Sequence, residues 1–266
     1  MNGSAESMKI TRVFFLMGRG TKNLLSQAGF TLRLLFESLY YTKDIIVRRR
    51  EIVKQMYLAG VKTLLVCSMV GLFTGMILAL QSGIEMREFG QQALIGGLVV
   101  ASMLREMGPF MSGLILAASV GSAMAAEVGA MKVYDEIDAL ELMLINPVRF
   151  LVMPRVVALA LVMPIISIYI DVLACLGGAI VAKQVLQVSY NVYMKYLLQA
   201  VHFKSMYVGL LKAFVFGLIV SSISCAYGLR ADGGVLGVGH ATRTSVVASF
   251  LMVLIIGYYI TSIFYG

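Results

Sequence analysis

Residues 105–155 read REMGPFMSGLILAASVGSAMAAEVGAMKVYDEIDALELMLINPVRFLVMPR, and the expected fold follows from this stretch. Its first part, from Met107 to Ala126, is twenty uncharged residues, which is enough for a helix to cross a bilayer. Small residues recur there at every fourth position, at Gly113, Ala117, Gly121, Ala125 and Gly129. In lipid, such a row lets a second helix approach at backbone distance. We therefore expect a tightly packed span.

The polarity changes abruptly after this span. Four of the chain's fourteen acidic residues fall within seven positions, at Asp135, Glu136, Asp138 and Glu141. Apolar residues lie between them, at Ile137, Leu140, Leu142, Met143 and Leu144. Segment 134–144 therefore predicts a short amphipathic helix outside the membrane. Pro147 and Pro154 bracket its return to a second apolar run after Arg155, so we interpret the acidic segment as a docking surface for a soluble partner.

The composition indicates an all-α polytopic membrane protein. The chain has 266 residues, of which 59% are hydrophobic, and a mean hydropathy of +0.88. Basic residues that flank spans and meet anionic headgroups explain the net charge of +8 better than nucleic acid does. We expect no cleavable signal peptide, because residues 1–20 lack an apolar core followed by a small-residue cleavage site. The three cysteines lie inside apolar runs, so we expect small core residues there, at Cys67, Cys175 and Cys225.

Five spans and one N-terminal helix are expected in a single permease domain. The basic region 8–50 has a helical apolar stripe, which favours a helix in the membrane interface over a soluble helix packed on a partner. That stripe is Leu25, Ala28, Leu32, Leu35 and Leu39. A basic cluster over 48–62 predicts a cytoplasmic N-terminus, and an odd number of spans then places the C-terminus outside. The five-span core, 63–264, has expected spans at 63–82, 107–126, 156–182, 205–229 and 244–264; Gly71 and Gly75 form a packing pair on the first.

Three connecting segments complete the expected topology. Residues 89–104 are apolar but short for a span, so we expect a helix on the outer side, or a partly re-entrant one, that leads into the second span. Residues 183–204 carry three tyrosines suited to a membrane interface, at Tyr190, Tyr193 and Tyr196. The glycine-rich segment 230–243 is expected to be a flexible cytoplasmic loop.

Several kinds of chemistry lack their motifs in this sequence. There is no GxxxxGK[ST] phosphate loop and no GxSxG nucleophile elbow. The two histidines, His202 and His240, stand far apart without HExxH or CxxC motifs. We therefore expect no catalytic residue, no metal site and no nucleotide-binding loop in the chain itself.

Charged residues near membrane depth are the candidates for function, because they are costly unless they face a cavity or a partner. Arg105 and Glu106, just before a Gly-Pro step, either line a cavity that handles a polar headgroup or pair with each other or with neighbours. Glu127 is expected to have a structural role, either capping the helix or pairing with a base such as Arg155. Asp171 makes either a helix–helix hydrogen bond or a contribution to transport.

Several blocks together resemble the MlaE permease family: LREMGP at 104–109, GSAMAAEVGAMKVYDEIDALELM at 121–143 and NPVRFLVMPR at 146–155. GLFTGMILALQ at 71–81 and HATRTSV at 240–246 extend the similarity over nearly all of the chain after the basic N-terminus. The resemblance implies a homodimeric permease in the bacterial inner membrane that moves phospholipid between the inner and outer membranes. It also implies two cytoplasmic ATPases that bind ATP and Mg, and a periplasmic MCE-domain protein. The permease itself is expected to bind no cofactor.

The resemblance also implies roles for particular residues. The family's Arg-Glu pair at its lipid cavity falls on Arg105 and Glu106, and a cavity tyrosine of well-known members falls on Phe89, which lacks the hydroxyl. With Leu104 these are the expected lipid-binding residues. The family's coupling helix falls on segment 134–144, with Asp135, Glu136, Asp138, Leu140 and Glu141 as the expected ATPase contacts. Two other classes stay open on the residues alone: a secondary carrier, although no inverted repeat is visible, and a membrane scaffold that recruits a soluble complex.

Overall fold

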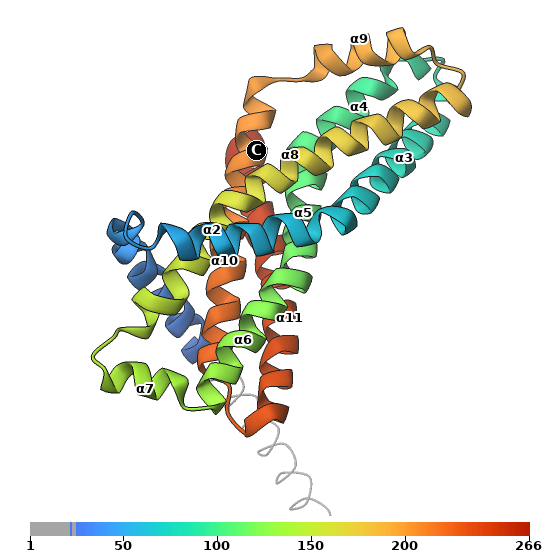
Figure 1. Ribbon diagram of the computed structural model, residues 1–266. Coiled ribbons are helices and arrows are strands. Elements are labelled where there is room, and N and C mark those ends of the chain that lie inside the picture. Colours follow the sequence, from blue (N-terminus) through green and yellow to red (C-terminus); the bar gives the residue numbers. More distant parts are fainter. Residues whose placement is uncertain (1–21, 23–24) are drawn as a thin grey trace, which may run out of the picture.

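The structure is a computed structural model that describes Lys22 and residues 25–266. The described residues are mostly helical and contain no strand. Five helical segments are long and apolar enough to span a bilayer: Arg49–Glu88, Gln92–Val133, Val148–Gln184, Phe203–Leu229 and Gly234–Tyr265 (Figure 1). The all-α, five-span fold expected from the sequence is confirmed. The first half of the predicted interfacial region 8–50 lies largely outside the described residues.

Most spans are built from several helical elements in direct succession. The first is α2 (Arg49–Gly60) and α3 (Leu64–Glu88), so it starts well before the expected boundary at 63. The second joins α4 (Ile95–Ser102), α5 (Gly108–Leu116) and α6 (Ser122–Val133) through π-helical turns at Met103–Met107 and Ala117–Gly121. A third π-helical turn, Val148–Val152, leads into α8 (Met153–Gln184). The fourth and fifth spans are α10 (Phe203–Leu229) and α11 (Gly234–Tyr265).

The glycines of the first span let α3 pack closely on α8. A Cβ atom placed on Gly75 would run into the backbone of Ala174, and one on Gly177 of α8 would run into Leu72. The Gly71 position is almost as tight, since its Cβ would lie 3.0 Å from the carbonyl oxygen of Ile170. This glycine pair therefore holds two spans of one copy together.

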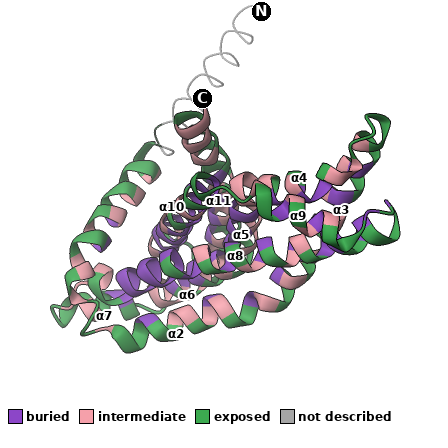
Figure 2. Ribbon diagram, turned by 90° about the horizontal axis from the view of Figure 1, so that it is seen from above, coloured by how far each residue is buried: buried purple, intermediate pink, exposed green. Residues whose placement is uncertain are grey.

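The small-residue row of the second span also faces helices of the same chain. A Cβ on Gly121 would lie 2.8 Å from the Ser224 hydroxyl of α10, and one on Gly113 would lie 3.3 Å from Val253 of α11. Gly129 lies equally close to the residues that begin α11, and the alanines of the row, Ala117 and Ala125, are fully buried. Burial is accordingly concentrated along α8 and α10, at the centre of the molecule (Figure 2).

Residues 89–104 form part of a long helix that leads into the second span. After a turn at Gly90, α4 runs through the π-helical turn into α5 and packs against α9 (Tyr190–Ala200). Tyr193 of α9 is 1% exposed and donates a hydrogen bond of 3.1 Å to the Cys175 carbonyl oxygen. Burial raises the pKa of this hydroxyl, which therefore stays a donor. The interface role expected for Tyr193 is wrong, because this side chain belongs to the core.

The expected glycine-rich loop at 230–243 is mostly helix. Only a short turn separates α10 from α11; it ends at Gly233, and the φ angles of Gly233 and of Gly234, the first residue of α11, are 90° and 70°, which suit glycine. The rest of the segment is the first part of α11, where Val238 packs against Gly129 of α6. The prediction failed because tertiary packing outweighs the low helix propensity of the remaining glycines.

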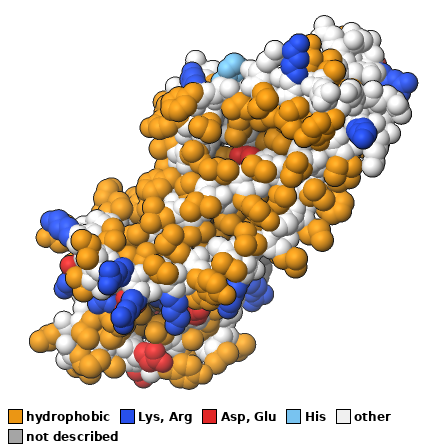
Figure 3. Space-filling model, turned by 45° about the horizontal axis from the view of Figure 1, so that its top comes forward, with side chains coloured by type: hydrophobic (Ala, Val, Ile, Leu, Met, Phe, Trp, Pro, Cys, Tyr) orange, Lys and Arg blue, Asp and Glu red, His pale blue; other side chains and the backbone are white. Residues whose placement is uncertain are grey.

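A helix over residues 25–40 precedes the first span and packs on the side of the bundle. Leu34 is 2% exposed and forms a small core with Val156 of α8 and Cys225 of α10. Leu32 and Phe36 are exposed. The face of the molecule that Figure 3 shows is broadly apolar, with Lys and Arg side chains gathered toward its two ends. This distribution suits a protein whose middle lies in a bilayer.

Candidate functional site: a polar cluster at the end of an apolar pocket

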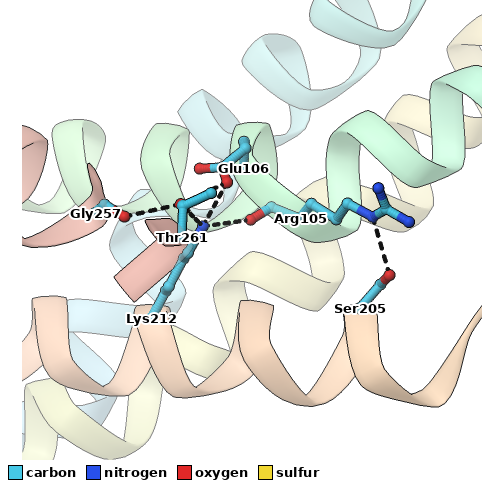
Figure 4. A network of polar contacts seen from close by, with 6 residues as sticks. All are labelled: Arg105, Glu106, Ser205, Lys212, Gly257 and Thr261. Atoms are coloured by element: carbon cyan, nitrogen blue, oxygen red, sulfur yellow. Dashed lines mark hydrogen bonds and ion pairs between the residues drawn. The ribbon is translucent and has the colours of Figure 1, made fainter. Parts of the chain in front are cut away.

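Three spans bring polar side chains to one point inside the helical bundle. Glu106 comes from the π-helical turn before α5, Lys212 from α10 and Thr261 from α11 (Figure 4). The Lys212 ammonium lies 2.6 Å from Oε1 of Glu106 and 2.7 Å from the Thr261 hydroxyl. It also donates a 2.9 Å hydrogen bond to the main-chain carbonyl oxygen of Arg105.

This arrangement satisfies a lysine that is otherwise almost fully removed from solvent. The Lys212 side chain is 1% exposed, whereas that of Glu106 is 42% exposed. An ammonium has three protons to donate, and Lys212 has three acceptors. The Thr261 hydroxyl also lies 2.7 Å from Oε1 of Glu106, so carboxylate, ammonium and hydroxyl form a closed triangle. The carboxylate is thereby held in place with one side open.

Arg105 and Glu106 do not pair with each other, although they are adjacent. The Arg105 side chain points away from the triangle (Figure 4), and its Nε donates to the Ser205 hydroxyl at 3.1 Å. Its guanidinium also lies over the Tyr265 ring, 5.1 Å from the ring centroid. The sequence left open whether these two residues line a cavity or pair with each other or with neighbours. In the structure both contact neighbouring residues, and Glu106 also lines a pocket.

That pocket has a volume of about 480 Å³ and lies between α5, α10 and α11. Glu106, Lys212 and Thr261 form its polar end. The rest of its wall is apolar or aromatic, from Met107, Phe110, Phe216, Val253, Leu254, Gly257 and Tyr258. A pocket with one charged end and an apolar body suits an amphipathic ligand.

Two of the expected lipid-binding residues lie elsewhere. Phe89 is 72% exposed just after α3, and the turn at Gly90 and about 20 Å of helix from Gln92 onward, at 1.5 Å per residue, separate it from Arg105. Leu104 is half-buried against the core, and its carbonyl faces Gly209 of α10. Neither side chain lines the pocket of Glu106 within one copy of the chain.

Three further charged residues lie along the spans, away from this pocket. Glu127 accepts a 3.1 Å ion pair from Arg155, as expected, and Arg155 also donates to the Leu151 carbonyl oxygen at 2.8 Å. Asp171 is 6% exposed, and its Oδ1, directed at Gly108, has no hydrogen-bond partner in the described part of the chain. The helix–helix hydrogen bond weighed for Asp171 is therefore not formed at this oxygen.

The acidic segment forms a short surface helix, α7 (Glu136–Leu142), at the end of the molecule away from α9 (Figure 1). Ile137 anchors it against Val128 and Leu151, and Leu140 packs on the same small core. The acidic side chains Asp135, Glu136, Asp138 and Glu141 are exposed. Three apolar side chains beyond them also project into solvent, at Leu142, Met143 and Leu144, with exposed fractions of 86%, 61% and 96%.

Lys212 and Thr261 were not among the residues expected from the sequence. A lysine near the start of an expected span is a signal in its own right, because an intramembrane charge marks a partner or a pathway. Thr261 gave no such signal, since threonine is common in spans. Among residues 22 and 25–266, no three His, Cys, Asp or Glu side chains gather in a way that could hold a metal ion.

The family profile described as "Permease MlaE" matches residues 52–263, which include every residue of the pocket. The chain belongs to the MlaE permease family. It is 37% identical over 214 residues to a probable ABC transporter permease protein of Rickettsia conorii, covering 80% of this chain and 83% of that one. A probable ABC transporter permease protein of Synechocystis is 31% identical over 215 residues, covering 81% and 82%.

A plant relative widens the comparison. Protein TRIGALACTOSYLDIACYLGLYCEROL 1, chloroplastic, of Arabidopsis thaliana is 31% identical over 216 residues, which cover 81% of this permease and 62% of the plant chain. These relationships make the chain a multi-pass permease subunit of an ABC transporter. Such a subunit carries the transport path and requires an ATPase partner.

Proposed function

We propose that this MlaE-family permease moves phospholipid between the inner and outer membranes of a bacterium. The observation that carries the proposal is the amphipathic pocket at Glu106, Lys212 and Thr261. Its apolar wall suits acyl chains, and its polar end suits a headgroup. The name of the Arabidopsis relative, which is that of a diacylglycerol lipid, supports the lipid class.

Two residues at the polar end of the pocket have different roles in headgroup binding. Lys212 already donates to three acceptors, so its main effect is to hold the Glu106 carboxylate in place. The Glu106 carboxylate is accessible from the pocket and can accept from a headgroup amine or hydroxyl. The Nε of Arg105 donates a hydrogen bond to Ser205. The two terminal nitrogens of its guanidinium suit a lipid phosphate that enters from the other side of the π-helical turn Met103–Met107.

We assign each of the other parts of the transporter to the surface of the permease that suits it. A separate ATPase subunit docks on α7, which places the α7 end of the permease in the cytoplasm and the α9 end, with the C-terminus, in the periplasm. A periplasmic MCE-domain protein exchanges lipid at the α9 end. A second copy packs on α11, because only 11% of its most apolar stretch is buried, compared with 67% for α10.

The test is reconstitution of the permease with its ATPase in vesicles that contain fluorescent phospholipid, with MCE-domain protein as the acceptor. We expect lipid transfer that needs ATP, and ATP hydrolysis that lipid stimulates. Transfer driven by an ion gradient without ATP would favour a secondary carrier. A complex that assembles but transfers no lipid would favour a scaffold, and either result would overturn the proposal.

A further inference from the structure

A second amphipathic site lies at the other end of α10, where two pockets share a wall. One pocket, of about 300 Å³, is polar and lies where α10 turns into α11. The other, of about 400 Å³, is an apolar groove between helix 25–40 and the two spans. Gln27 and Tyr227 line both. At 1.5 Å per residue, Arg230 of the polar pocket lies about 27 Å along α10 from Lys212, roughly the thickness of a bilayer core.

The polar pocket carries one arginine and one aspartate, and His240 also lines it. Arg230 is held by a 2.8 Å hydrogen bond from Nη1 to Oε1 of Gln27 and by the Phe30 ring, 4.1 Å from the guanidinium carbon. Within the described part of the chain, its other guanidinium nitrogens make no hydrogen bond and Asp232 makes no ion pair. The pocket thus offers a positioned cation beside an accessible carboxylate.

The groove is apolar along its length. Helix 25–40 docks on the bundle through Leu34, which leaves its neighbouring face to form one wall of the groove. The apolar side chains that line it are Ala28, Leu32, Leu35, Ile219, Ile223, Ala248, Leu251, Met252 and Ile255. Ser222 also lines the groove, and its buried hydroxyl has no partner among the described residues.

We propose that this double pocket binds a zwitterionic phospholipid of the leaflet on the α7 side. The phosphate contacts Arg230, the headgroup amine contacts Asp232, and one acyl chain lies in the groove along helix 25–40. The opposite charges at the junction select this occupant, because a helix from a second copy would bring no headgroup to them. The inference needs only the placement of the five spans in a membrane and does not depend on lipid transport.

The test uses the full chain in nanodiscs with phosphatidylethanolamine that carries a photoreactive group in its acyl chain. After irradiation, mass spectrometry locates the labelled peptides. We expect labels at 28–35, 219–223 and 248–255. Arg230→Gln should lower this labelling about tenfold, the effect of losing one strong charge-assisted contact. Ala248→Phe should lower it by filling the groove.

Matched controls separate this site from general lipid contact. Arg243→Gln removes an exposed arginine that lines neither pocket, and Ala118→Phe enlarges an exposed alanine of the second span, so both should leave labelling unchanged. A phosphatidylglycerol probe with the same acyl chain should label the groove about tenfold less, since it has no amine for Asp232. Equal labelling by both lipids, equal labelling of the exposed face of α3, or crosslinks from the groove to a second copy would each overturn the proposal.

Discussion

A lysine ammonium buried in a membrane span needs an acceptor for each of its protons, and Lys212 has three. Replacing it with methionine keeps the length of the side chain but removes the side-chain donor to the Arg105 carbonyl and one of the two donors to the Glu106 carboxylate. We expect Lys212→Met to abolish most ATP-driven lipid transfer and to lower stability by about 1–3 kcal/mol, the usual cost of an unsatisfied buried group. Transfer assays and thermal unfolding in detergent measure the two effects.

A double variant separates the effect of the polar cluster on lipid transfer from its effect on the stability of the protein. Lys212→Met with Glu106→Gln removes both charges, so stability should largely return while lipid transfer stays low. Lys204→Met, which removes a cation beside the Tyr265 ring outside the triangle, is the control and should transfer lipid normally. Normal transfer by the double variant would exclude a headgroup function for the cluster.

Gly75 illustrates how close the spans approach at single residues. A methyl group there would run into the Ala174 backbone, whereas one on Gly29 of helix 25–40 would meet nothing. Both are helical glycines, so Gly29→Ala should be neutral or stabilising by up to about 1 kcal/mol. Gly75→Ala should lower the unfolding temperature and increase proteolysis at the α3–α8 contact. Equal stability of the two variants would show that α3 and α8 do not pack this closely.

At the scale of an element, α7 combines an acidic face with projecting leucines. We expect the double charge reversal Glu136→Lys and Asp138→Lys to weaken ATPase binding, and Leu144→Asp to do the same through the apolar contact. Co-purification of the ATPase with the permease measures both. Membrane insertion should be unchanged, because α7 contributes only Ile137 and Leu140 to the core.

Another acidic residue provides the control for this charge reversal. Glu51 is exposed on α2 and lies outside the acidic segment, so Glu51→Lys should leave co-purification unchanged. Coupled ATP hydrolysis at the normal rate in the α7 double variant would remove this helix from the docking surface.

For the whole molecule, the least buried span is the one available to a second copy. Tyr259 of α11 is 57% exposed and lines none of the described pockets. We expect Tyr259→Cys to give a disulfide-linked dimer in membranes under mild oxidation. Leu65→Cys, on the exposed side of α3, should stay monomeric on a denaturing gel. A dimer linked through position 65 instead would move the interface to α3.

How much of the fold the sequence predicts depends on the length of chain over which a sequence pattern extends. Long uncharged runs predicted five spans, because bilayer thickness sets their length. The acidic run predicted a surface helix, and the Glu127–Arg155 pair was expected from charge alone. The sequence could not show which glycines pack within one copy. It also could not show that α11 begins at Gly234, since packing on α6 outweighs weak local propensity.

For the same reason, only half of the candidate site could be predicted from the sequence. Arg105 and Glu106 stood out as charges beside a Gly-Pro step. Their true partners lie about a hundred or more residues away in the chain, at Ser205, Lys212 and Thr261. Contacts of that separation depend on how the spans are arranged, which no local pattern encodes.

The π-helical turn Ala117–Gly121 determines which face of the second span, beyond the turn, points toward its neighbouring helices. On a regular α-helix, residues four apart drift around the axis by about 40° at each step, so a five-member row would wind off its partner. The wider turn takes up this excess rotation and returns Gly121 and Gly129 to the side of α10 and α11. Deleting Ser119 would remove the extra residue of this turn, so we expect a regular α-helical turn in its place, with α6 still in phase and the Glu106 pocket intact.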